Sequence, residues 1–285
     1  MCSDWNEEVY RLRINNASQF LRFEAASPNA EEIKQYRDYA LSCTRDNSRQ
    51  PRALVLGITP ELRCMAAAAG FELISADRSP DAISIYQDWL QEPARSQEKI
   101  IRGDWTVLGE QISGGIDVIL GDGVFGNIHG LESHRELLQE LISLLNPGGG
   151  VVLRQALIPR GFPVEDYESM VLLEKYRAGQ LSDGEFGLAM RLWGVSRLAY
   201  NPDTCLLDNK IVYDYYDSLR QSGDVTPAEL EVVRRYYFVG KNMILQQDLW
   251  EEILASTGLS FEVQPLTGRD WYAYYPVYCC RPTAQ

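Results

Sequence analysis

The sequence predicts an α/β protein with a doubly wound, mostly parallel seven-stranded sheet and an antiparallel C-terminal strand. Short apolar β-prone runs alternate with amphipathic helical segments between residues 52 and 154, as in parallel sheets covered by helices on both faces. The first run ends at Gly57 and the second at an acid, Asp77. The acid lies 77 − 57 = 20 residues after the glycine, the spacing of a ribose-binding carboxylate in nucleotide-binding units.

The first strand–helix–strand unit is the clearest part of the pattern. Residues 53–56 are apolar, and Thr59 and Pro60 occupy the cap and first position of a helix that Gly70 ends. Residues 71–76 then form the second strand, which leads into Asp77. This unit is half of a nucleotide-binding fold.

Three further strands are expected, at residues 99–102, 116–120 and 151–153, the last after a sharp turn at 146–149. A short helix is expected at 106–112. Right-handed crossovers place the carboxyl ends of these strands on one side of the sheet, where ligands bind. The polar or glycine residues at those ends are Gly57, Asp77, Asp104 and Asp122.

The remaining chain is expected to surround this core. Residues 1–48 form an N-terminal helical cap, in which Trp5 and Phe20 belong to one apolar stripe and Ser27 caps a second helix. Residues 160–245 form a helical insertion after strand 5, on the substrate side. The domain boundaries are therefore 1–48 for the cap, 49–159 plus 246–285 for the core, and 160–245 for the insertion. Within the last core segment a helix is expected at 246–256, followed by two antiparallel strands at 260–265 and 271–280.

Composition bounds the function. The 285 residues are 45% hydrophobic, and the net charge of −13 disfavours nucleic-acid binding, which requires many cations. Six cysteines include no CxxC pair, so neither a disulfide framework nor a metal site is expected. No signal core or membrane-length apolar run is present. We expect a cytoplasmic protein acting on a small molecule.

Five segments in order resemble the motifs of class I S-adenosylmethionine-dependent methyltransferases. They read LVLGITPEL, LISADRSPDAI, IIRGDW, IDVILGDG and LLNPGGGVVLR. The resemblance covers residues 52–154 and 246–285 and implies a Rossmann-like methyltransferase that uses S-adenosyl-L-methionine. The cofactor-binding residues it implies are Gly57, Thr59, Pro60, Glu61, Asp77, Arg78, Gly103, Asp104, Trp105, Gly121, Asp122 and Gly123.

The implied roles follow from chemistry. The Asp77 carboxylate accepts hydrogen bonds from the ribose hydroxyls, and Gly57 lets the backbone approach the ligand. Asp104 accepts from the adenine amino group beside Trp105, and Asp122 faces the reacting centre. Each has a structural alternative, such as a helix cap, a turn or a core side chain.

Candidates for catalysis and substrate binding are fewer. His129 follows the fourth motif and is the candidate base, whereas His134 is expected on a solvated helix face. Eight tyrosines of the insertion either wall a substrate pocket or pack the insertion. They are Tyr167, Tyr176, Tyr200, Tyr213, Tyr215, Tyr216, Tyr236 and Tyr237.

One departure from the family keeps two alternatives open. The first motif of the family usually carries two or three glycines, but here Gly57 stands alone before residues 58–61. A non-catalytic protein that binds the cofactor or its product S-adenosylhomocysteine is therefore one alternative. An NAD(P)-dependent oxidoreductase is the other, although the turn lacks GxGxxG.

Overall fold

The computed structural model describes residues 6–14, 22–44 and 49–283. Its main sheet has seven strands in the order β11-β12-β5-β4-β1-β2-β3. All neighbouring pairs are parallel except those made by β12, which runs antiparallel to β5 and β11. The predicted fold class is confirmed. The strands are β1 (Arg52–Leu56), β2 (Glu72–Asp77), β3 (Lys99–Arg102), β4 (Ile116–Asp122), β5 (Leu145–Arg154), β11 (Leu259–Val263) and β12 (Val277–Pro282).

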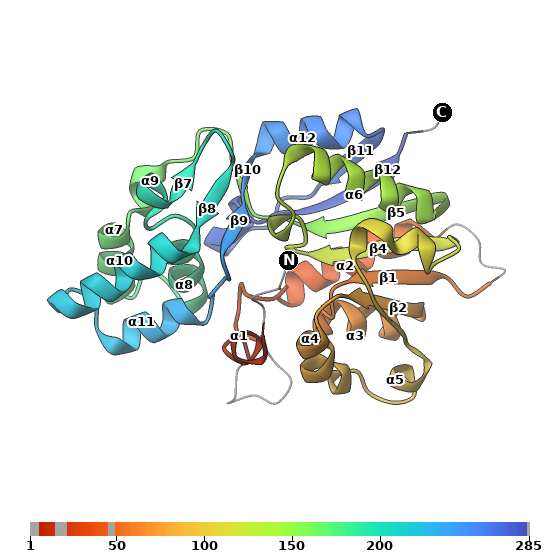
Figure 1. Cartoon of the computed structure of the whole chain (residues 1–285), viewed down its shortest axis with the longest axis horizontal. Coiled ribbons are helices and arrows are strands. Elements are labelled where there is room, and N and C mark those ends of the chain that lie inside the picture. The colour runs from red at the N-terminus through yellow and green to blue at the C-terminus, as the bar shows by residue number, and fades with distance from the viewer. Residues whose placement is uncertain (1–5, 15–21, 45–48, 284–285) are drawn as a thin grey trace.

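Helices cover both faces of this sheet (Figure 1). One core lies between the sheet and helices α6 and α12, and another lies between the opposite face and helices α2 and α3. Cys280 belongs to the first core and its neighbour Cys279 to the second, as alternation along a strand requires. The helices around the sheet are α2 (Ala30–Ser42), α3 (Pro60–Ala68), α4 (Pro80–Tyr86), α5 (Ala94–Gln97), α6 (Leu131–Leu144) and α12 (Gln247–Ser256).

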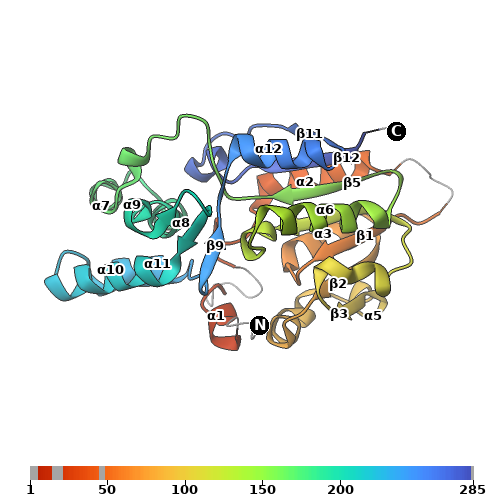
Figure 2. The same ribbon diagram turned by 45° about the horizontal axis from the view of Figure 1, so that its top comes forward.

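The insertion lies beyond the carboxyl ends of β4 and β5 (Figures 1 and 2). Its side chains form a separate core, joined by Ala25 and by residues 271–274 near the C-terminus. The capping boxes at Ser182–Glu185 and Thr226–Glu229 are present. The helices are α7 (Ser169–Arg177), α8 (Asp183–Leu192), α9 (Ser196–Ala199), α10 (Asn209–Ser222) and α11 (Pro227–Arg234).

The insertion is mainly helical, as expected, but it also contains a three-stranded antiparallel sheet that the sequence did not predict. A short parallel pair, β6 with β10, joins it to the core. These strands have two or three residues each, too short for a period-2 pattern to reveal. They are β6 (Leu157–Ile158), β7 (Tyr200–Asn201), β8 (Leu206–Asp208), β9 (Lys241–Met243) and β10 (Leu245–Gln246).

The described part of the N-terminal region, residues 6–14 and 22–44, is less helical than expected. Its first helix, α1 (Glu7–Arg11), has five residues and packs beside α4. Helix α2 is capped by Asn29 rather than Ser27, because Asn29 forms a reciprocal capping box with Glu32. Trp5 and Phe20 lie outside the described residues.

Three local expectations at the sheet also change. Residues 146–149 belong to β5, with a register shift opposite the start of β4, instead of forming a turn. The helix expected at 106–112 is the 3₁₀ segment η2 (Trp105–Glu110). The second C-terminal strand begins at Val277, because residues 270–273 form a 3₁₀ turn, η5 (Asp270–Ala273). The other 3₁₀ segments are η1 (Gln87–Trp89), η3 (Phe125–Asn127) and η4 (Val164–Tyr167). Of the helices described, none has the length and apolar character needed to cross a membrane.

Candidate functional site

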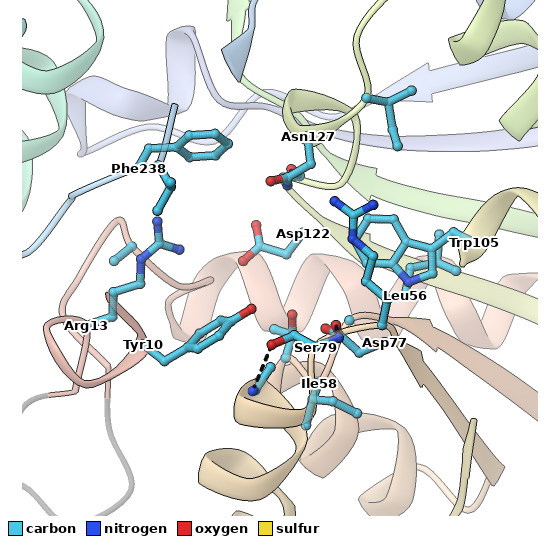
Figure 3. Close-up of a pocket in the computed structure, with 18 of the residues that line it drawn as sticks. Tyr10, Arg13, Leu56, Ile58, Asp77, Ser79, Trp105, Asp122, Asn127 and Phe238 are labelled. Atoms are coloured by element: carbon cyan, nitrogen blue, oxygen red, sulfur yellow. Dashed lines mark hydrogen bonds between the residues drawn. The ribbon is translucent and has the colours of Figure 1, made fainter. Parts of the chain in front are cut away.

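A cavity of about 520 Å³ opens at the carboxyl ends of the parallel strands, where the strand order reverses between β1 and β4. Its size suits a cofactor or small ligand. Figure 3 shows Trp105, Leu56 and Asp77 on one side and Arg13 and Phe238 on the other. The predicted residues that line it are Gly57, Thr59, Asp77, Arg78, Gly103, Asp104, Trp105, Asp122, Gly123 and His129.

Gly57 forms the turn between β1 and α3 with φ = +84°, a conformation that favours glycine. A Cβ at this position would lie 3.7 Å from Asp77 Oδ2, 3.8 Å from Thr59 Oγ1 and 3.9 Å from Trp105 Cζ2. These are ordinary van der Waals distances, so the positive φ rather than a lack of space favours glycine here, and without a Cβ the three side chains border a small gap. Thr59 occupies the cap position of α3, but its side chain makes no capping hydrogen bond.

Asp77 ends β2 at the rim of this gap. Its Oδ1 accepts a hydrogen bond of 2.7 Å from the backbone N–H of Ser79. Burial raises the pKa of Asp77, while backbone N–H donors at Ser79 and Ile58 oppose the rise. The carboxylate is thus held in place and partly dehydrated, which strengthens hydrogen bonds to a ligand.

The loop after β3 supplies an aromatic wall. The indole Nε1 of Trp105 donates a 2.7 Å hydrogen bond to the Ala76 carbonyl, which fixes the half-buried ring against the end of β2. Asp104 caps η2 by accepting from the backbone and hydroxyl of Thr106. Its Oδ2 lies 3.9 Å from Arg78, and both side chains are about half exposed.

Two acids expected to face the cofactor are already paired. Glu61 accepts a two-pronged interaction from Arg22, whose Nη2 lies 2.6 Å from Glu61 Oε2. Asp122 Oδ1 accepts from Arg154 at 2.8 Å, and its Oδ2 lies 3.7 Å from Arg22. Arg154 also pairs with buried Glu32 at 2.9 Å. These residues form a network of alternating charges, called the charged floor below, which reaches the cavity through Arg22 and Asp122.

Three predicted residues, all within the described chain, do not line the cavity: Pro60, Glu61 and Gly121. Gly121 lies in β4, where a Cβ would come within 2.9 Å of Leu153 and Val124. Its carbonyl accepts a hydrogen bond of 2.6 Å from Tyr36. These contacts give Gly121 a packing role at the sheet.

The two histidines differ in environment. Nε2 of exposed His129 lies 2.9 Å from the Lys241 carbonyl, an acceptor. Nε2 therefore carries the proton in the neutral ring, and Nδ1 is left as the basic nitrogen. His134 is fully buried, with Nε2 bonded to the Phe125 and Ile128 carbonyls, so the expectation of a solvated side chain was wrong. Burial lowers the pKa of His134.

The sequence did not reveal the residues that close the cavity opposite the sheet. Tyr10 and Arg13 come from the N-terminal segment, and Leu188, Arg191 and Phe238 come from the insertion. Of the insertion tyrosines, Tyr236 lines this cavity, Tyr216 is buried in the insertion core, and five others are partly buried against that core: Tyr167, Tyr176, Tyr200, Tyr213 and Tyr215. A signal for Arg191 was present, because it is the one charge in the apolar run 186–195.

No group of three or more His, Cys, Asp and Glu side chains that could hold a metal ion occurs in the described part of the chain. No protein-family model matches the sequence, and no curated protein matches it.

Solved structures resemble the whole chain at low sequence identity. A protein provisionally described as a zinc-dependent alcohol dehydrogenase from Rhodobacter sphaeroides shares 17% identity, with a TM-score of 0.54 over 99% of this chain and 100% of that one. The CcbJ methyltransferase of Streptomyces caelestis shares 13% (TM-score 0.53; 92% and 99% covered). Magnesium protoporphyrin IX methyltransferase of Synechocystis PCC 6803, with bound S-adenosylhomocysteine, shares 14% (TM-score 0.51; 97% and 93% covered). The chain thus has the class I methyltransferase fold.

Proposed function

We propose that the protein is an S-adenosylmethionine-dependent methyltransferase acting on a small molecule. The observation that carries this proposal is the arrangement of Gly57, Asp77 and Trp105 at the ends of adjacent strands. Together they form a glycine gap, a held carboxylate and an aromatic wall, which suit the backbone approach, the ribose hydroxyls and the adenine ring of an adenosyl group. The methyltransferase fold of the chain supports the same reading.

In this proposal the cofactor supplies an activated methyl group on a sulfonium, and the protein's main task is to position the nucleophile. Asp77 holds the ribose and Trp105 lies beside the adenine. Thr59 and Arg78 line the same wall, and His129 is the candidate base through Nδ1, because its Nε2–H is bonded to a carbonyl. The network around Asp122 fixes the cavity floor.

An oxidoreductase is the second candidate, supported by the structural resemblance to the Rhodobacter protein described as an alcohol dehydrogenase. Dinucleotide sites bind a pyrophosphate at a glycine-rich turn that opens a helix. Here the turn after Gly57 continues with Ile58, Thr59 and Pro60, and Pro60 lacks an N–H to donate. This difference favours the adenosyl cofactor.

Calorimetric titration with S-adenosylmethionine, S-adenosylhomocysteine and NAD tests the proposal. We expect both sulfur ligands to bind wild-type protein, and Asp77→Ala to weaken them by about 100-fold, because hydrogen bonds to a charged group contribute ~1.5–3 kcal/mol each. Asp88→Ala, an exposed acid paired with Arg95, is the matched control and should bind normally. Binding of NAD alone would refute the proposal. Binding of S-adenosylhomocysteine without methyl transfer to any acceptor would favour the non-catalytic alternative.

A further inference from the structure

Arg191 is a buried cation that faces the cavity. It lies in the last turn of α8 and is 7% exposed. Its guanidinium lies over the ring of Phe238, with Cζ 5.0 Å from the centroid. Its Nη1 has no hydrogen-bond partner among the described residues. A cation buried in this way is unfavourable unless an anion pairs with it.

The other buried arginine side chains of the described chain each form an ion pair with a carboxylate. Arg63 pairs with Glu98, Arg154 with Glu32 and Asp122, and Arg22 with Glu61. No ion pair to Arg191 occurs in the described structure. Arg191 is therefore a buried guanidinium for which the described residues supply no acidic partner.

The surroundings of Arg191 increase its need for an anion. The pKa of Arg191 is lowered to about 10, mainly by burial and also by the neighbouring positive charge of Arg13, so the side chain remains charged at neutral pH. Arg13 is partly buried and donates to the Tyr237 carbonyl at 2.8 Å. The neighbouring phenols of Tyr213 and Tyr275 raise the pKa of Arg191 and so oppose these two effects. Two guanidiniums thus line the same end of the cavity.

This end is opposite the proposed adenosyl wall. In Figure 3, Arg13 and Phe238 lie across the cavity from Asp77 and Trp105, and the contact with Phe238 places Arg191 on their side. Leu188 lies one turn earlier on α8 and lines the cavity together with Tyr236. The positive charge is therefore bordered by apolar and aromatic surface.

We propose that the acceptor substrate carries an anionic group, a carboxylate or a phosphate, on an apolar body, and that Arg191 binds this group with help from Arg13. This proposal rests on the proposed methyltransferase function, because only a methyltransferase makes the bound anion a methyl acceptor. Charge-assisted hydrogen bonds from a guanidinium to an oxyanion are strong and directional. The apolar body lies against Leu188, Tyr236 and Phe238, with its reactive atom directed toward the adenosyl wall.

The test measures binding of benzoate, phenyl phosphate and the neutral analogue benzamide to protein saturated with S-adenosylhomocysteine. We expect at least one anion to bind ten-fold or more tightly than benzamide, and the stronger of the two identifies the anionic group. Arg191→Gln should remove this preference and Arg191→Lys should keep part of it. The control Arg235→Gln should leave it unchanged, since Arg235 also lies over a ring, Phe23, but pairs with Asp183.

A second readout separates a binding role from a structural one. Removing an unpaired buried charge should raise the melting temperature of the ligand-free Arg191→Gln protein by a few degrees, whereas loss of a structural contact would lower it. Equal binding of benzoate, phenyl phosphate and benzamide, or no binding of either anion, would overturn the proposal. So would an Arg191→Gln protein that loses S-adenosylhomocysteine affinity, because Arg191 would then serve the cofactor's own carboxylate. If wild-type protein does not bind S-adenosylhomocysteine, the proposed function fails, and the same anion titrations without it still decide the role of Arg191.

Discussion

Charged side chains are stabilised differently on the two sides of the cavity. On the sheet side, polar groups lie at strand ends and are held by nearby backbone, as the Ser79 N–H holds Asp77. On the opposite side, cations come from segments distant in sequence, and Arg191 has no carboxylate partner in the described structure. The first arrangement suits the cofactor, which is the same in every reaction. The second suits a substrate whose anionic group supplies the missing negative charge.

The charged floor connects separate segments of the fold through Arg154. Arg154 at the end of β5 donates to Asp122 and Glu32 and lies over the ring of Tyr275, with Cζ 4.3 Å from the centroid. It therefore ties the sheet to the N-terminal segment and to the C-terminal turn. A paired network of this kind is expected to stabilise the fold, unlike Arg191.

The largest effect is expected from breaking this floor. Arg154→Met leaves the carboxylates of Glu32 and Asp122 buried near each other without their main partner, which should lower the free energy of unfolding by ~3–5 kcal/mol. Urea denaturation measures it. Arg160→Met is the control, because Arg160 forms exposed pairs with Asp248 and Glu251, and should cost less than ~1 kcal/mol. A similarly small loss in Arg154→Met would show that this charged network contributes little to the stability of the fold.

The next effect concerns pH on the sheet side. Burial raises the pKa of Asp77, so protonation begins at a higher pH than for an ordinary aspartate. The ionised carboxylate is the form that accepts from both ribose hydroxyls. Affinity for S-adenosylhomocysteine should therefore be constant above this pKa and fall by up to about ten-fold per pH unit below it. Asp77→Asn should bind weakly with this pH dependence removed, as calorimetry over a pH series can measure. Persistence of the dependence in Asp77→Asn would assign it to another group.

The same contrast explains what the sequence could predict. The places of Gly57 and Asp77 at the ends of neighbouring strands could be predicted, because strand ends and a 20-residue spacing are local properties. The location of Glu61 and Asp122 near the site was also predictable, but their partners Arg22 and Arg154 lie 39 and 32 residues away. Pairing over such distances depends on tertiary packing, which single-sequence patterns do not encode.

Two errors had different causes. His134 precedes Leu137, Leu138 and Leu141 at helical spacing, so the pattern itself places it on the buried face of α6. The prediction relied on the polarity of the histidine side chain and not on its position in the helix. The short strands of the insertion, by contrast, offered no pattern to read, because β7 and β10 have two residues each.

The smallest effect separates two roles of Trp105 on the sheet side. Trp105→Phe removes the Nε1 hydrogen bond to the Ala76 carbonyl but keeps an aromatic face. That carbonyl still accepts from Gly57 N at 2.8 Å, so the loss of stability should be at the low end of ~0.5–1.5 kcal/mol. Affinity for S-adenosylhomocysteine should change little in Trp105→Phe, whereas Trp105→Ala should lose the ~1–3 kcal/mol of a base–aromatic stack. Calorimetry and urea denaturation on the two variants measure both quantities. Equal affinity of the Phe and Ala variants would mean that the indole closes the end of β2 without touching the adenine, and the aromatic wall would then belong to the fold rather than to the ligand.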